Sequence, residues 1–93
     1  MNTLDALTIP REMVPIVKSS LQLKKQALEF SLSRYRDRLS AFEQQYSMSS
    51  EIFAARFKAG ELGENAHWFE WQYILEAYHE TVRQLDLLET VPV

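Results

Sequence analysis

The chain has 93 residues, of which 46% are hydrophobic and 25% are charged, and its formal net charge is −3. This composition is typical of one folded domain with a thin core and excludes an intrinsically disordered chain. The absence of cysteine excludes disulfides and thiolate metal sites, and no apolar run is long enough to cross a bilayer. Because the first residues also lack the pattern of a signal peptide, we expect a cytoplasmic protein with no membrane partner.

Residues 1–18 differ from the rest of the chain because Pro10 and Pro15 interrupt them. Proline lacks a backbone donor and pushes the preceding residue toward extended geometry, so the sequence predicts an extended or partly disordered N-terminal arm, in which a single helical turn can begin at Pro10. The arm is nevertheless apolar, which favours docking on another surface. Its candidate contact residues are Ile9, Met13, Val14 and Ile16.

A long helix is predicted from Ser19 to about Tyr46. Ser19 is followed three residues later by Gln22, the arrangement of a capping box. Apolar residues then recur with alternating spacings of three and four, which predicts one apolar seam along a helix. The seam consists of Leu21, Leu28, Leu32, Tyr35, Leu39, Phe42 and Tyr46, with Lys25 at one seam position.

The next segment predicts a bend that contains a short helix. Three serines within residues 47–50 favour capping over continuation of the first helix, so a new helix is expected to start there. Its inward side chains are expected to be Ile52, Phe53, Ala54 and Phe57. Gly60 suits the left-handed residue at a helix end, and Gly63 permits a second change of direction.

Asn65 can cap a second long helix over residues 66–89, before Pro92. Its seam repeats the same spacing with Trp68, Trp71, Leu75, Tyr78, Val82 and Leu85. The second helix is acidic and the first is basic, which favours their pairing. Residues 19–90 therefore predict an all-α domain, a long antiparallel helical hairpin with a short helix at the bend.

Aromatic residues concentrate near this bend. Eight of them lie between residues 42 and 73 and are expected to form one cluster, namely Phe42, Tyr46, Phe53, Phe57, Trp68, Phe69, Trp71 and Tyr73. Aromatic side chains bury large apolar areas, so the bend is expected to be the most stable part of the hairpin. The open end of the hairpin has a sparser seam.

Several apolar residues lie off the predicted seams and require another surface to cover them. They are Leu23 and Phe30 in the first helix and Ile74, Leu87 and Leu88 in the second. A second copy would cover them as a homodimer with a four-helix bundle, the usual solution for long amphipathic hairpins. The N-terminal arm is an alternative cover.

No residue pattern predicts catalysis, a cofactor or a metal. His67 and His79 are separated by about 18 Å along one helix, too far to share a metal ion. Glu76 and Glu80 are one helical turn apart, but no Glu-x-x-His motif accompanies them. The serines are explained by helix capping, so we expect a protein that is not an enzyme.

Nucleic-acid binding is not expected for the chain alone. Arg34 and Arg38 share a helix face, but Asp37 lies between them and the overall charge is acidic. A chain of this charge lacks the broad basic surface that phosphate binding requires.

The bend contains the run Phe42-x-x-x-Tyr46-x-Met48-Ser49-Ser50-x-x-Phe53, then Arg56-Phe57-x-x-Gly60-Glu61-Leu62-Gly63, then Phe69-Glu70-Trp71. In these residues the chain resembles small helical prokaryotic proteins encoded beside genes regarded as toxin genes, which are considered antitoxin-like components. The resemblance implies a non-enzymatic protein that occludes a cognate toxin. A structural oligomerisation or scaffold protein is the alternative, and a nucleic-acid-binding regulator is a less favoured one.

Overall fold

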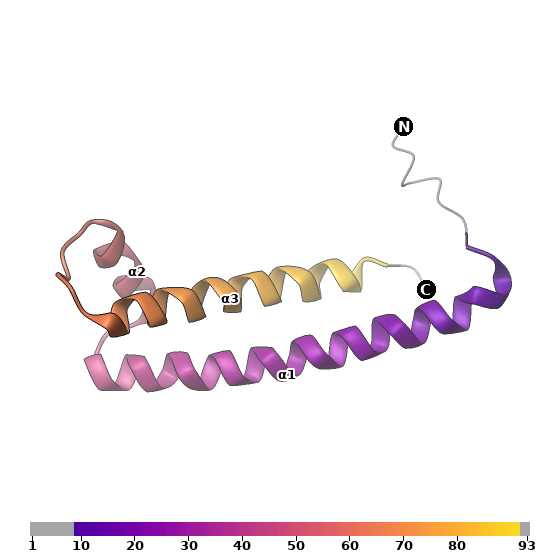
Figure 1. Ribbon diagram of the computed structural model, residues 1–93, viewed down its shortest axis with the longest axis horizontal. Helices are drawn as coiled ribbons and strands as arrows, with labels where there is room; N and C mark the ends of the chain where they lie inside the picture. Colours follow the sequence, from indigo (N-terminus) through magenta and orange to yellow (C-terminus); the bar gives the residue numbers. More distant parts are fainter. Residues whose placement is uncertain (1–8, 92–93) are drawn as a thin grey trace.

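The computed structural model describes residues 9–91, and every regular element within them is helical. The 3-10 turn η2 (Arg11–Met13) leads into α1 (Val14–Tyr46), followed by α2 (Ser50–Lys58) and α3 (Ala66–Glu89). Figure 1 shows α1 and α3 side by side and antiparallel, with α2 at the bend. The predicted all-α hairpin with a short helix at its bend is thereby confirmed. None of the described helices is both long and apolar enough to span a membrane.

The first long helix starts earlier than the sequence predicted. Pro15 occupies its first turn, where proline is tolerated because its missing N–H would have no intrahelical acceptor. The N–H of Met13 donates to the carbonyl oxygen of Pro10 at 2.8 Å, and this turn leads directly into α1. The predicted start at Ser19 is therefore wrong, as is the extended geometry expected for residues 14–18, whereas the helical turn that the sequence allowed at Pro10 is present. The earlier part of the expected arm lies outside the described residues.

The bend follows the predicted capping closely. Ser47 ends α1 in a left-handed conformation with a φ of 51°, and Ser49 then caps α2 by accepting a hydrogen bond from the N–H of Ile52. Gly60 and Gly63 both have positive φ, as predicted, at 72° and 70°. Asn65 was likewise expected to cap the second long helix, and its side chain accepts from the N–H of His67 at 2.9 Å.

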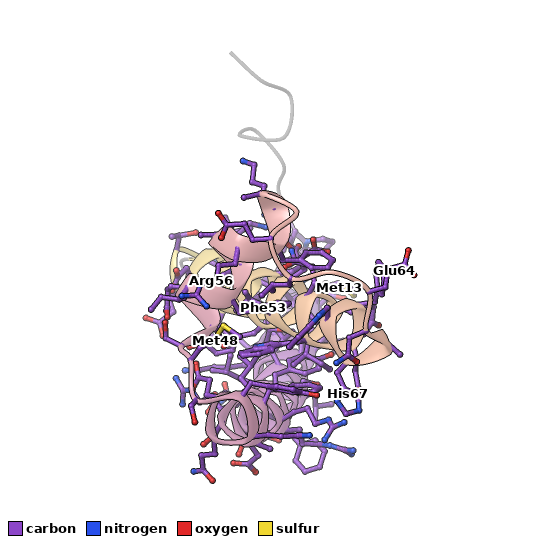
Figure 2. The ribbon with its side chains drawn as sticks, turned by 90° about the vertical axis from the view of Figure 1, so that its left-hand side faces the viewer. Met13, Met48, Phe53, Arg56, Glu64 and His67 are labelled. Atoms are coloured by element: carbon purple, nitrogen blue, oxygen red, sulfur yellow. The ribbon has the colours of Figure 1, made fainter. Side chains whose placement is uncertain are left out.

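The core lies at the bend and is organised around Trp71. The Trp71 ring is stacked between Phe53 and Phe42, with ring centroids 4.0 Å and 5.4 Å away, and all three side chains are fully buried. These rings come from three different helices, so one stack connects α1, α2 and α3. Figure 2 looks onto the bend and shows Phe53 directed between the helices. The buried cluster consists of Leu39, Phe42, Phe53, Trp68, Trp71 and Leu75.

Three side chains expected inside the bend are instead largely exposed. Tyr73 and Phe69 are each 67% exposed, although the Phe69 ring still makes an edge contact with Phe57. Ile52 lies on the solvent side of α2. The predictions for Tyr73 and Ile52 are therefore wrong, because α2 contacts α3 with the face that carries Phe53.

Polar contacts hold α2 in place over the stack. The buried hydroxyl of Ser50 accepts a hydrogen bond from the indole Nε1–H of Trp71 at 3.0 Å, and the Ser50 N–H donates to the Glu43 carboxylate at 2.9 Å. On the exposed side of the hairpin, Arg38 of α1 forms an ion pair with Glu70 of α3 at 2.6 Å. Its guanidinium also lies over the Phe42 ring, 4.7 Å from the centroid.

Replacing Trp71 with alanine tests whether the stack determines stability. We expect Trp71→Ala to lower the free energy of unfolding by about 3–5 kcal/mol, because it removes a buried ring between two others. The matched control is Tyr73→Ala, which we expect to change it by no more than about 0.5 kcal/mol because Tyr73 is exposed. Urea unfolding followed by helical circular dichroism measures both. Equal losses in the two variants would contradict this account of the core.

Replacing Ser50 with alanine tests the buried hydrogen bond. Ser50→Ala leaves the Trp71 indole N–H without its acceptor, and we expect a loss of about 1–3 kcal/mol in the free energy of unfolding. Ser40→Ala is the control, since Ser40 is exposed on α1. A Ser50→Ala protein as stable as the Ser40→Ala protein would show that the hydrogen bond contributes little.

Candidate partner-binding surface

The two long helices are unequal in length, so they cannot cover each other completely. α1 has 33 residues and α3 has 24, which correspond to about 50 Å and 36 Å of helix. Because α2 and the aromatic core join them at the bend, the excess length of α1 projects at the opposite, open end (Figure 1). The first turns of α1 therefore have no α3 residue beside them.

Two shallow grooves lie where α3 ends, and together they form what we call the open-end surface. The first is lined by Lys18, Leu21, Gln22, Lys25 and Leu88. The second is lined by Lys24, Leu28, Gln84, Leu87, Leu88 and Val91. Leu88 belongs to both grooves and separates them. The open-end surface is thus lined by leucines from both helices and by three lysines.

The charge of this surface is locally basic although the whole chain is acidic. Its three lysines, Lys18, Lys24 and Lys25, all come from α1. The neighbouring Arg83 of α3 is already paired, because its guanidinium donates to both carboxylate oxygens of Glu80 and lowers the pKa of that carboxyl to about 2. The open-end surface therefore suits an acidic segment that also carries apolar side chains.

The structure divides the predicted contact residues into three groups. Ile9, Met13, Ile16, Leu23 and Phe30 are exposed. Val14 and Leu88 are half-buried, and Leu88 lines the open-end surface. Ile74 packs against the aromatic core, so its assignment as an off-seam residue is wrong.

Sequence reasoning missed the role of the lysines and the projection of α1. Lys25 was placed at a seam position, but it is exposed because α3 ends beside it, and it lines the first groove. The available signal was the position of Pro15, since proline in a first turn is compatible with a helix that starts at Val14. Helix lengths counted from that residue would have predicted the projection.

The two histidines occupy unrelated positions. The Nδ1 atom of His67 is hydrogen-bonded to the Tyr46 hydroxyl, and its ring makes an edge contact with Phe42. Figure 2 shows His67 at the edge of the bend, beside α1. His79 is exposed further along α3, beside the ring of Tyr78. Within residues 9–91 no group of three or more histidine or carboxylate side chains could hold a metal ion.

Comparisons with known proteins give no match that bears on these surfaces. No protein-family model, no curated protein and no solved structure matches the chain.

Hydrogen exchange tests whether the open end lacks tertiary support. We expect the backbone amides of residues 18–22 to exchange at least about 100-fold faster than those of residues 39–43 in dilute solution. The physical reason is that a short helical segment without a packed neighbour is only marginally stable in water. Nuclear magnetic resonance measures both sets in one sample. Equal protection of the two segments would mean that another surface covers the projecting part of α1.

Proposed function

We propose that this protein is a non-enzymatic protein-binding module that acts by occluding its partner. The observation that carries the proposal is the open-end surface, where two leucine-lined grooves lie beneath three lysines. Apolar grooves between helices with a polar rim are typical protein-binding sites. The favoured partner segment is acidic and carries apolar side chains that reach Leu21, Leu28 and Leu88.

The antitoxin-like role is the specific form of this proposal. It is supported by the resemblance at the bend, whose residues include the core rings Phe42, Phe53 and Trp71. Those rings are buried, so they support the fold rather than contact a partner. A cognate toxin would instead bind at the open end, and the long hairpin would block the surface that the toxin needs. We further propose a cytoplasmic protein that associates as a homodimer.

The alternative is a scaffold protein that only self-associates. The observation that favours it is the set of exposed apolar side chains on α1, including Ile16, Leu23 and Phe30, which lie outside the grooves on the face of α1 away from Leu28. In a scaffold, these side chains would form contacts between copies of the same chain, and no second protein would be needed.

Charge reversal tests the open-end surface with the product of the adjacent gene as the partner. We expect the double variant Lys18→Glu/Lys25→Glu to weaken the complex by about 10–100-fold, mainly through slower association. The difference should shrink at high salt because exposed charges are screened. Isothermal titration calorimetry and stopped-flow mixing measure the two effects.

The matched control is Lys58→Glu, because Lys58 is also an exposed lysine but lies on α2 at the bend. We expect this variant to bind like the natural protein. A complex that is equally weakened by Lys58→Glu, or unaffected by the double variant, would place the contact elsewhere. If the protein formed no complex with the product of the adjacent gene, the antitoxin-like role would be contradicted and the scaffold alternative would remain.

A further inference from the structure

A second apolar stripe runs along α1, on a different face from the seam that packs on α3. It consists of Met13, Ile16, Ser20, Leu23, Ala27 and Phe30. The spacings alternate between three and four residues, as along a helix–helix interface, and the stripe is about 26 Å long. It lies about a third of a turn around the helix from Leu28, so α3 does not cover it. Its large members are exposed, up to 67% for Leu23 and 66% for Phe30.

We infer that this stripe is a self-complementary interface at which two copies of α1 pair in antiparallel orientation. The inference rests on the proposed self-association and specifies its surface and register. In this register Ser20 faces Leu23 of the second copy, Ile16 faces Ala27, and Met13 faces Phe30. A twofold axis repeats each contact, as an isologous dimer requires.

The sizes of the side chains favour this register. Every contact near the centre pairs a large residue with a small one, so that Ser20 and Ala27 provide the space that Leu23 and Ile16 fill. A parallel pairing in register would place Leu23 on Leu23 and Ser20 on Ser20. That arrangement crowds one layer and leaves a gap in the next, which close packing disfavours.

The charges at the ends of the stripe favour the same orientation. Arg34 continues the stripe beyond Phe30, and its guanidinium lies over that ring, 5.9 Å from the centroid. The antiparallel register places Glu12 of the second copy three residues, less than one helical turn, from the position that faces Arg34, and the symmetry repeats this arrangement. A parallel register would instead bring Arg34 to Arg34 and Glu12 to Glu12, and like charges across an interface are unfavourable.

A second copy fits the stripe better than a membrane surface does. Helices that lie on anionic membranes are rich in lysine and arginine on their polar face. One border of this stripe is formed by Ser19, Gln26 and Ser33, which are uncharged. Small polar residues at the border allow two helices to approach closely.

The resulting dimer has the two copies of α1 in its centre and one α3 on each outer side. The four helices then form an array and do not share a single core, and the two bends lie at opposite ends. The two grooves around Leu88 face α3, away from the stripe, although Lys18 and Gln22 also line a groove with Leu23. A dimer of this kind presents two copies of the partner-binding surface.

Disulfide cross-linking tests the register directly, because the chain contains no cysteine. Ile16→Cys and Ala27→Cys variants with tags of different mass are mixed and mildly oxidised. We expect the disulfide between the two variants as the main product, identified by mass spectrometry. Each variant alone should cross-link poorly, since the register keeps its own two cysteines about 16 Å apart along the helix axis.

The control experiment uses the Glu29→Cys variant instead of the Ala27→Cys variant. Glu29 is also exposed and is two residues from Ala27, but it lies on a different face of α1. Equal cross-linking to Glu29→Cys would indicate random collisions and overturn the inference. Predominant disulfides within each single variant would indicate a parallel pairing, which also overturns it.

Analytical ultracentrifugation separates failure of the register from failure of self-association. We expect the natural chain to form dimers and Leu23→Glu to raise the dissociation constant on the order of 100-fold, since each copy would bury a charge. Tyr73→Glu is the control, because Tyr73 is a 67% exposed residue on α3 outside both the stripe and the open-end surface. A dimer insensitive to Leu23→Glu would overturn the inference and leave self-association standing.

If the protein remained monomeric at concentrations up to about 1 mM, that result would overturn both the inference and the proposed homodimer. It would not affect partner binding at the open-end surface, which the charge-reversal experiment tests separately. Binding of the monomer to anionic phospholipid vesicles, abolished by Leu23→Glu, would assign the stripe to a lipid surface and overturn the inference.

Discussion

The stack of Phe42, Trp71 and Phe53 is the interaction on which the rest of the structure depends. The three rings come from three helices, and Trp71 lies between the other two. A hairpin of two long helices could otherwise slide along its seam, because its leucines are nearly equivalent. The stack, together with the hydrogen bond from Trp71 to Ser50, removes that freedom by holding all three helices at one point.

Stability concentrated at the bend has a consequence for the other end. Because α1 is longer than α3 and both are held at the bend, the unmatched part of α1 projects at the open end. The residues there include exposed Ile16 and Leu23, which no described element covers. An exposed apolar surface of this extent on a small protein usually marks a contact with another macromolecule. The fold therefore has a packed end at the bend and an uncovered end, at which we propose that a partner binds.

The two proposed contacts use different faces of the same helix. The open-end surface combines Leu21 and Leu88 with lysines, which suits an acidic partner, whereas the stripe through Leu23 and Phe30 is self-complementary. The centres of the two faces lie about a third of a turn apart, and Lys18 and Gln22 lie between them, because they line one groove with Leu88 and another with Leu23. An antitoxin-like protein would gain from this arrangement, because a dimer presents its partner site twice.

The sequence by itself determined the helices and most of the bend. Asn65, Ser49, Gly60 and Gly63 have the predicted capping and turn roles, since these depend on local backbone chemistry. The start of α1 was mispredicted because proline disrupts a helix interior but is tolerated in the first turn of a helix. Pro15 lies in the first turn of α1.

The buried hydrophobic residues of the long helices all belong to the predicted seams, and only the tertiary structure decided which residues beside those seams are also covered. Trp71 and Tyr73 are both aromatic residues of the same helix, yet one is fully buried and the other is largely exposed. Ile74 looked unpartnered in the sequence but is partly buried and packs against the core. The physical reason is that burial depends on the lengths and angles at which helices meet, and the spacing of residues within one helix does not specify them.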